Sequence, residues 1–409
     1  MHKHKSNCRI CQSENLTKFL DLGMQPPANS FLKNPKEFLT ETKYPLEVYF
    51  CHDCNLVQLL DVVDKEELFS NYIYFSSGMP KLSDHFRLYA EDVMKRFLKP
   101  GDFVVELASN DGILLKFFQD AGYKVLGIDP AENVVTIAKK IGVETLVDFF
   151  SQSLAKKVAS EYGHAKVIMA NNVVAHIDDH HDLAKGLGEL LAEDGVFVFE
   201  APYLVDMFNN LTYDTIYHEH LSLLSVRPLL KLFENFGLEL FDVEIHPVQG
   251  QSLRGFVGRK GKHVVTPNVK KYVDLELSMG LDKLEAYQAL AKRVENQKIQ
   301  LTQLLKKLKQ EGKRIAAYGA PAKGNTMLNY CGIGTDILEF ALEDLPAKQN
   351  MFTPGMHIPT VDAAYAHSHE PDYYLMLAWN YEKPILEKEQ AYLKKGGKFI
   401  VPVEGIRIV

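Results

Sequence analysis

Four of the five cysteines form two pairs with the spacing C-x-x-C, Cys8 with Cys11 and Cys51 with Cys54. This spacing lets two thiolates on one tight turn bind the same tetrahedral metal ion, and two such turns complete a site of four thiolates. Because no position is then left for water, the metal is expected to be structural rather than catalytic. In a cytoplasm, one zinc ion is favoured over two disulfides. Cys331 is expected to be a buried small hydrophobic residue.

A turn of small residues follows the apolar run Phe103–Leu107 and precedes a predicted helix. Such a turn lets the backbone approach a nucleotide closely at the edge of an open α/β sheet. Asp129 ends the next predicted strand about 20 residues later, where an acidic residue accepts ribose hydroxyls. We therefore predict a site for S-adenosylmethionine. Its predicted ligands are Glu106, Ala108, Asn110, Asp111, Gly112, Asp129 and Pro130, with Asn171 and Asn172 from the end of a later strand.

A generic nucleotide-binding turn, above all one for NAD, is the alternative, because Ala108 stands where methyltransferases usually have glycine. Two features favour S-adenosylmethionine. The turn lacks the pattern G-x-G-x-x-G. In addition, the apolar runs Leu238–Ile245 and Leu253–Val257 predict a closing hairpin, whose antiparallel strand simple dinucleotide-binding sheets lack.

Acid–base side chains are concentrated after the fifth predicted strand, at Tyr217, His218, Glu219 and His220. If this segment is extended, Tyr217 and Glu219 face one way and the two histidines the other. His176, after the fourth strand, is a candidate for the same crevice. The alternatives are a surface loop or a histidine that binds a buried carbonyl. A second metal site is disfavoured, because this segment contains only two histidines and one acidic residue as potential ligands.

The elements that must position these residues alternate between strands and helices, which predicts an α/β fold with parallel sheets covered on both faces. We expect a zinc-binding N-terminal domain over residues 1–75. A Rossmann-like methyltransferase domain with the closing hairpin should cover 76–265, and a second Rossmann-like domain 280–409. Between them, an amphipathic segment from Leu284 to Leu308 predicts a packed connecting helix rather than a dimerising coiled coil.

Length and charge limit the functions that the chain can have. The 409 residues suffice for two or three domains. The net charge of −7 and the lack of a basic stripe with interleaved aromatic residues argue against nucleic acid as partner. No run approaches the ~20 apolar residues of a membrane helix, and the N-terminus is polar. We expect a cytoplasmic protein without a membrane partner, present as a monomer or weak oligomer.

In these motifs the chain resembles the sugar 3-C-methyltransferases of deoxysugar biosynthesis, which include the D-mycarose 3-C-methyltransferases. The resemblance runs through nearly the whole chain, and one departure is Gly250–Arg254, where two glycines are expected before the serine. The segments that carry it are the cysteine pairs, Pro27–Phe31, Glu106–Gly112, Asn172–His176, Tyr217–Leu221 and Ala320–Gly324.

The resemblance implies a nucleotide-linked 4-keto-6-deoxyhexose, carried on dTDP or GDP and methylated at C3 through an enolate. His220 is then the base, since imidazole titrates near working pH. Tyr217 and His176 would bind the keto or enolate oxygen. Glu219 would orient His220 or bind a sugar hydroxyl.

The second Rossmann-like domain is expected to bind the sugar nucleotide. Its turn at residues 319–324 offers backbone amides at a helix start, and Lys323 adds a charge for the diphosphate. Tyr72 and Tyr74 from the first region are also expected to border the substrate, with core packing as the alternative. The predicted substrate ligands are Tyr72, Tyr74, Ser76, Ser77, Ala320, Lys323 and Gly324, in a cleft between all three domains.

Three other functions stay open at this point. A relative with the same architecture could methylate C5 instead of C3. A nucleic-acid methyltransferase could use the zinc module to grip RNA, which the charge disfavours. A catalytically silent scaffold with two nucleotide-type domains is the third, and the joint presence of the acid–base residues argues against it.

Overall fold

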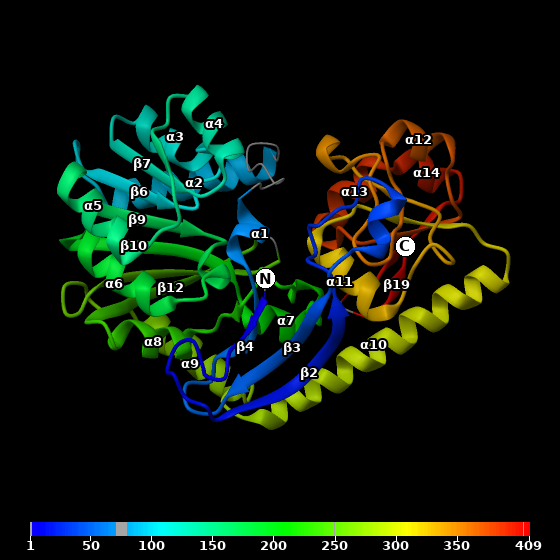
Figure 1. Ribbon diagram of the computed structural model, residues 1–409, viewed down its shortest axis with the longest axis horizontal. Coiled ribbons are helices and arrows are strands. Elements are labelled where there is room, and N and C mark those ends of the chain that lie inside the picture. The colour runs from blue at the N-terminus through cyan, green and yellow to red at the C-terminus, as the bar shows by residue number, and fades with distance from the viewer. Residues whose placement is uncertain (1, 71–79, 249, 404) are drawn as a thin grey trace.

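The computed structural model describes residues 2–70, 80–248, 250–403 and 405–409. The sheet of the predicted methyltransferase domain and the C-terminal sheet lie apart, with strands β2 and β3 and the long helix α10 beneath both (Figure 1). Tyr72, Tyr74, Ser76 and Ser77, predicted to contact the substrate, lie outside the described residues.

The N-terminal part forms two small antiparallel sheets. One has the order β11-β4-β3-β2, and the other pairs β1 with β5. Strand β11 belongs to the first sheet although it comes from the methyltransferase part of the chain, directly after Leu221. The segment of acid–base residues therefore continues directly into a strand of the N-terminal sheet. The strands are β1 (His2–His4), β2 (Leu16–Gln25), β3 (Tyr44–Cys51), β4 (Val57–Leu59), β5 (Asp61–Val63) and β11 (Ser222–Leu223).

The second sheet has seven strands in the order β12-β13-β10-β9-β6-β7-β8. Strands β8, β7, β6, β9 and β10 run parallel, and β13 pairs antiparallel with both β10 and β12. The predicted Rossmann-like fold with a closing antiparallel hairpin is confirmed. Its strands are β6 (Phe103–Leu107), β7 (Lys124–Asp129), β8 (Thr145–Val147), β9 (Ala165–Asn171), β10 (Leu191–Pro202), β12 (Leu238–His246) and β13 (Ser252–Arg259).

Helices cover both faces of this sheet, which is why β6 is buried along its whole length. Side chains of α2, α3 and α4 pack on one face, and those of α5, α6 and α8 on the other. The helices are α2 (Pro80–Phe97), α3 (Ile113–Asp120), α4 (Glu132–Lys140), α5 (Gln152–Tyr162), α6 (His180–Leu190) and α8 (Val226–Glu234), with α1 (Lys65–Phe69) before the sheet and α7 (Leu204–Asn210) after β10.

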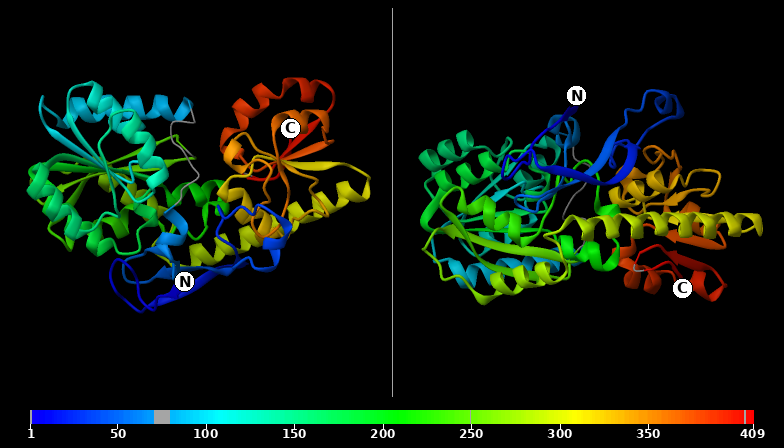
Figure 2. Two further views of the ribbon diagram at one scale, coloured as in Figure 1. Left: turned by 45° about the horizontal axis from the view of Figure 1, so that its top comes forward. Right: turned by 90° about the horizontal axis from the view of Figure 1, so that it is seen from below.

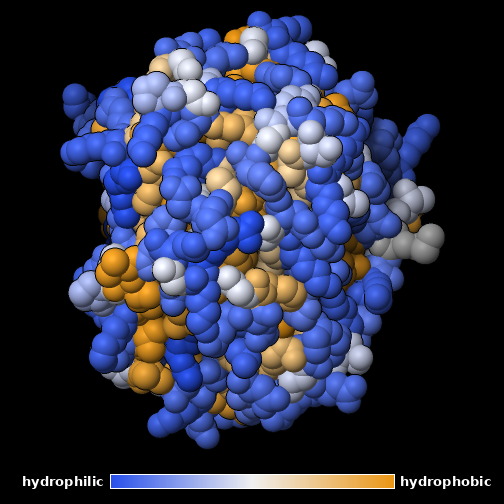
Figure 3. Space-filling model, turned by 90° about the vertical axis from the view of Figure 1, so that its left-hand side faces the viewer, coloured by the Kyte–Doolittle hydropathy of each residue, from blue (hydrophilic) through white to orange (hydrophobic). Residues whose placement is uncertain are grey.

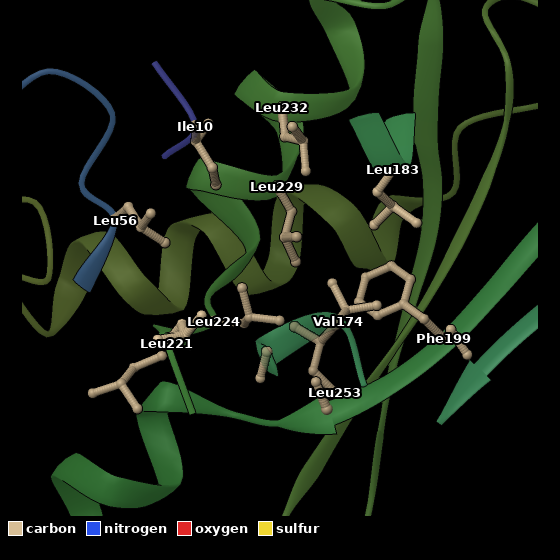
Figure 4. Packing of buried hydrophobic residues seen from close by; sticks show 14 of the residues in the cluster. Ile10, Leu56, Val174, Leu183, Phe199, Leu221, Leu224, Leu229, Leu232 and Leu253 are labelled. Carbon is tan, nitrogen blue, oxygen red and sulfur yellow. The ribbon is translucent and has the colours of Figure 1, made fainter. Parts of the chain in front are cut away.

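The zinc region shares its hydrophobic core with the methyltransferase sheet. Ile10 and Leu56, which lie close to the cysteines, point toward Leu221, Leu224 and Leu229 of the second domain (Figure 4). All five side chains are at most 5% exposed. A disturbance at the cysteines is therefore transmitted by packing to the segment that carries the acid–base residues.

Helix α10 (Leu284–Gln310) joins the two α/β parts, and α9 (Pro267–Ser278) precedes it. Tyr287, Leu290 and Val294 of α10 pack into the core shared by the first two domains. Leu301 and Leu305 pack into the C-terminal core. The helix runs from one part to the other in both views of Figure 2. The interpretation as a packed connecting helix agrees with this packing.

The C-terminal sheet has the order β16-β15-β14-β17-β18-β19, parallel apart from β19. Its strand order reverses between β14 and β17, the switch point at which open α/β sheets bind ligands. Helix α11 begins at Ala322, earlier than the expected start at Asn325, so Lys323 and Gly324 lie in its first turn. The elements are β14 (Ile315–Tyr318), α11 (Ala322–Cys331), β15 (Ala341–Leu342), β16 (Thr360–Val361), α12 (Ala363–Ser368), β17 (Tyr373–Met376), α13 (Glu382–Lys388), α14 (Gln390–Lys394), β18 (Lys398–Val401) and β19 (Arg407–Ile408).

The outer surface on the methyltransferase side is mostly hydrophilic, with smaller apolar patches among the polar side chains (Figure 3). No helix in the described part of the chain is long and apolar enough to cross a membrane.

Candidate active site and metal centre

The four paired cysteines converge on one point, where their sulfur atoms all lie within 4.8 Å of one another. The Sγ atoms of Cys8 and Cys54 are 3.5 Å apart, as are those of Cys11 and Cys51. Sulfur atoms bound to one tetrahedral zinc ion at about 2.3 Å would lie roughly 3.8 Å apart. The donor set and its spacing therefore fit one zinc ion, and no fifth ligand is needed.

The turn after β6 has the backbone conformation that explains its small residues. Ala108, Asn110 and Gly112 have φ angles of 51°, 51° and 79°. This left-handed region costs a residue with a Cβ atom roughly 1–2 kcal/mol, which accounts for the glycine usually expected at position 108. Oδ2 of Asp129 accepts a hydrogen bond of 2.9 Å from the N–H of Asn110. The acidic residue and the turn are thus fixed to each other.

Unpartnered polar atoms also lie near the carboxyl ends of β6 and β9, on Glu106, Asn171 and Asn172. Nδ2 of Asn171 donates to Oε1 of Glu106 at 3.3 Å. Oε2 of Glu106 and the Oδ1 atoms of Asn171 and Asn172 are buried without a hydrogen-bond partner among the described residues. Burial also raises the pKa of Glu106 well above its usual value. Buried polar groups of this kind require a partner, and a polar ligand such as S-adenosylmethionine supplies one.

Replacing Asp129 by asparagine is expected to weaken S-adenosylmethionine binding by about 10- to 100-fold, because a hydrogen bond to a charged group contributes about 1.5–3 kcal/mol. Its second oxygen, Oδ1, accepts from the N–H of Ala131 at 2.9 Å, so the amide also disturbs the turn. Isothermal titration with S-adenosylmethionine measures the change. Asp120→Asn, an exposed change at the end of α3, should leave the affinity unaltered. Equal affinities for both variants would remove Asp129 from the site.

The acid–base segment forms a turn and is not extended. The N–H of His220 donates to the carbonyl of Tyr217 at 2.8 Å. The turn brings the Tyr217 hydroxyl within 2.9 Å of Nε2 of His220, so the two residues lie on the same side. The alternation expected for an extended segment is therefore wrong. His218 points away, with Nε2 3.2 Å from the carbonyl of Pro45 in the N-terminal sheet.

His220 is held in one tautomer. Its Nδ1 lies 2.6 Å from the carbonyl oxygen of Thr215, which can only accept, so Nδ1 carries the proton. Nε2 then keeps its lone pair. Burial, aided by the positive charge of Lys323, lowers the pKa of His220 to about 4 despite the Thr215 carbonyl. The imidazole is therefore neutral near pH 7 and can accept a proton at Nε2.

His176 lies beside His220, with ring centroids 5.0 Å apart. Burial lowers its pKa well below the usual value, so it too is neutral. Its Nε2 is buried and has no hydrogen-bond partner among the described residues. The structure therefore brings His176, Tyr217 and His220 together, whereas an extended segment would have placed Tyr217 opposite His220.

Glu219 is hydrogen-bonded to the N-terminal domain. Its Oε1 accepts a hydrogen bond of 2.7 Å from Nδ2 of Asn29. The neighbouring carbonyl of Ala28 accepts one of 2.8 Å from Asn325 in α11. The segment Pro27–Phe31 thus links the acid–base turn to the C-terminal domain.

Lys323 comes from the first turn of α11 and stands over the ring of Trp379, with Nζ 4.1 Å from the ring centroid. Burial lowers the pKa of Lys323 to about 8, against the opposing effect of Asp214, so it stays mainly charged at pH 7. Its charge reaches His220, whose pKa it lowers. The C-terminal domain thus contributes a cation whose charge lowers the pKa of His220.

The other two predicted ligands of this turn are buried in the domain itself. The N–H of Ala320 donates to Oε2 of Glu343 at 3.2 Å and is already engaged. A Cβ at Gly324 would lie 2.8 Å from Cβ of Leu377, so glycine is required here for helix packing against β17. Of the predicted set in this turn, Lys323 is the residue with a side chain directed at the site.

Sequence reasoning missed three residues at this junction, namely Asn29, Asp214 and Trp379. Asn29 lies in Pro27–Phe31, one of the segments that carry the family resemblance, but no role was predicted for it. Trp379 is the only tryptophan in the chain, which was a usable signal. Its indole N–H donates to Oδ2 of Asp214 at 2.7 Å, across 165 residues of sequence. No local pattern reveals a contact of this range.

The sheet order, the polar residues at the carboxyl ends of β6 and β9 and the cysteine site define a methyltransferase that uses S-adenosylmethionine. Three family models match successive parts of the chain. They are described as a zinc binding domain (residues 8–69), a methyltransferase domain (82–243) and a C-methyltransferase C-terminal domain (247–404).

The C-methyltransferase NovU of Streptomyces niveus is 36% identical over 404 residues, covering 98% of this chain and 96% of NovU. The protein therefore belongs to the family of S-adenosylmethionine-dependent C-methyltransferases with these three domains, and its cofactors are S-adenosylmethionine and structural zinc.

Solved structures resemble the middle of the chain. PH0226 from Pyrococcus horikoshii OT3 is 16% identical, covers 48% of this chain and 98% of its own, and has a TM-score of 0.35. Magnesium protoporphyrin IX methyltransferase from Synechocystis PCC 6803 with bound S-adenosylmethionine is 12% identical, covers 44% and 79%, and has a TM-score of 0.32. These likenesses are too distant to bear on the substrate.

Proposed function

We propose that the protein transfers a methyl group to C3 of a nucleotide-linked 4-keto-6-deoxyhexose, carried on dTDP or GDP, through an enolate. The observation that carries this proposal is the neutral His220, hydrogen-bonded to Tyr217 and flanked by Lys323. A carbon becomes a nucleophile only after it loses a proton, and a ketone at C4 acidifies the hydrogens on its neighbouring carbons. A buried neutral base beside a hydroxyl donor and a cation suits this chemistry.

In the proposed reaction, Nε2 of His220 takes the proton from C3. The Tyr217 hydroxyl, which donates to Nε2 in the structure, turns to the oxygen at C4 and stabilises the enolate charge. The carbonyl of Thr215 stabilises the imidazolium through Nδ1–H. Bound S-adenosylmethionine supplies an electrophilic methyl group. His176, beside His220, completes the donors around the oxygen.

Lys323 supports a bound anion close to the reacting sugar. Because its charge acts on His220, we place the anionic group that it neutralises near C3 and C4. In a nucleotide sugar, the phosphate attached to C1 is the one nearest to the ring. We therefore assign Lys323 to that phosphate, with the rest of the nucleotide along the switch point between β14 and β17. The proposed partner is thus a small molecule and not a nucleic acid.

A proton-exchange assay tests the proposal. The protein is incubated in heavy water with a dTDP- or GDP-linked 4-keto-6-deoxyhexose, first without and then with S-adenosylmethionine. NMR should show enzyme-dependent deuterium at C3, followed by methylation at the same carbon. Exchange at C5, the other carbon next to the ketone, would move the reaction there. No exchange and no methylation with either nucleotide would contradict the substrate class.

The background exchange of the free sugar is measured with His220→Asn. Asparagine can still donate to the carbonyl of Thr215 but has no basic nitrogen. The difference between the two proteins is then the exchange due to the proposed base, and wild-type exchange no faster than this background would reject the enolate route.

A further inference from the structure

One hydrogen bond reaches from the C-terminal domain into the acid–base segment. The indole N–H of Trp379 donates to Oδ2 of Asp214 at 2.7 Å. Asp214 is 0% exposed and Trp379 is 8% exposed. A hydrogen bond to a carboxylate at such a protected place is stronger and more directional than one in water.

Asp214 stands next to the residue that holds His220. It is the middle residue of the one-turn helix Tyr213–Thr215. The carbonyl of its neighbour Thr215 accepts the Nδ1–H of His220 at 2.6 Å. Because the two residues share one rigid turn, a shift of Asp214 displaces that carbonyl. The orientation of the imidazole therefore depends on what holds Asp214.

The C-terminal domain holds this helical turn at a second point. The Tyr213 hydroxyl lies 3.6 Å from Sγ of Cys331 at the end of α11, and Tyr213 is fully buried. Packing at Tyr213 fixes where the turn lies. The hydrogen bond from Trp379 adds a directional contact at Asp214, one residue before Thr215, whose carbonyl accepts from His220.

We propose that the hydrogen bond between Trp379 and Asp214 positions the carbonyl of Thr215 and thereby fixes the tautomer and orientation of His220. Trp379 and Asp214 are positioning residues, since they act on the base through Thr215. The inference rests on the proposed role of His220. It adds that the base is assembled only when the C-terminal domain is docked.

The same tryptophan links this device to the substrate. One face of its ring carries Nζ of Lys323 at 4.1 Å, while its N–H binds Asp214. An anion that binds to Lys323 would therefore lie close to Trp379, the residue whose N–H binds Asp214. Trp379 thus contacts both Lys323, the proposed phosphate ligand, and Asp214, which positions the base.

The test uses the full-length zinc-loaded protein with ¹⁵N-labelled histidine. The signal of His220 is assigned by its loss in His220→Asn, and its ¹⁵N shifts report which ring nitrogen carries the proton. Wild type should show the proton on Nδ1. Trp379→Phe, which keeps the ring but removes the N–H, should show a mixture of tautomers. Its kcat should fall about 10- to 100-fold, because small displacements of a catalytic group cost about this much. Its KM for the sugar nucleotide should stay within about threefold.

Asp214 provides the matched pair of variants. Asp214→Asn keeps an oxygen that accepts from the indole and should retain the Nδ1 tautomer and most of kcat. Asp214→Leu breaks the bond from the other side and should match Trp379→Phe in tautomer and kcat, which covers the case that the tryptophan variant does not fold. Its KM is left out of this comparison, because Asp214 also raises the pKa of Lys323.

Wild-type tautomer and kcat in both bond-breaking variants would overturn the proposal, and so would a loss confined to KM. If wild type neither exchanges nor methylates any keto-sugar nucleotide, the proposed function fails. The NMR comparison still decides whether Trp379 sets the tautomer of His220.

Discussion

Replacing His220 by asparagine is expected to lower kcat by about 10²- to 10⁴-fold, the usual contribution of a general base. The substitution removes Nε2, the proposed proton acceptor. It leaves an amide that can still donate to the carbonyl of Thr215, so the turn from Tyr217 to His220 should keep its shape. Initial rates of methyl transfer, followed by S-adenosylhomocysteine formation, measure the effect.

The affinity for S-adenosylmethionine should be unchanged in this variant, because the predicted cofactor ligands lie on other segments. His218→Gln is the matched control from the same turn. Its side-chain N–H can still donate to the carbonyl of Pro45, which accepts from Nε2 of His218 at 3.2 Å in the structure. This control should retain kcat within about threefold, because the substitution keeps the hydrogen bond to Pro45. Equal losses in both variants would mean that the turn needs its histidines for folding and not for chemistry.

The placement of the turn after β6 next to Asp129 was predictable because its signals are local. The turn after β6 and Asp129 belong to adjacent β-α units, and their spacing alone places them at one edge of the sheet. The unusual φ of 51° at Ala108 shows why glycine is expected there, a cost that this chain accepts. The cysteine pairs are equally local, since each needs only one tight turn to present two thiolates.

The acid–base turn was not predictable in the same way. Alternation of side chains holds for a strand, whereas the hydrogen bond from the N–H of His220 to the carbonyl of Tyr217 closes a turn. That turn is held by contacts from distant segments, namely Asn29 from the N-terminal domain and Trp379 from the C-terminal domain. Sequence periodicity carries no record of contacts between residues 165 or more positions apart.

Loss of the zinc ion is expected to remove activity as well as stability. Structural zinc in small peptides contributes about 10–16 kcal/mol of apparent binding free energy, which is also folding free energy. Here the cysteines share a core with the methyltransferase sheet, so a chelator or Cys54→Ser should lower the melting temperature by about 10 °C or more. Zinc content by mass spectrometry should be one ion per wild-type chain. An unchanged melting temperature after complete removal would contradict the structural role.

We expect activity to depend on zinc through Arg9, which lies between the first two cysteines. It is 1% exposed, and its Nη1 donates to the carbonyl of Leu221 at 2.6 Å, directly after His220. Arg9→Met should therefore keep the zinc ion but lower kcat, because the carbonyl at the end of the acid–base turn loses its buried donor. A variant with zinc bound and kcat intact would limit the metal to stability. The expected loss would instead show that the zinc loop holds the catalytic turn from the N-terminal side, as Trp379 holds it from the C-terminal side.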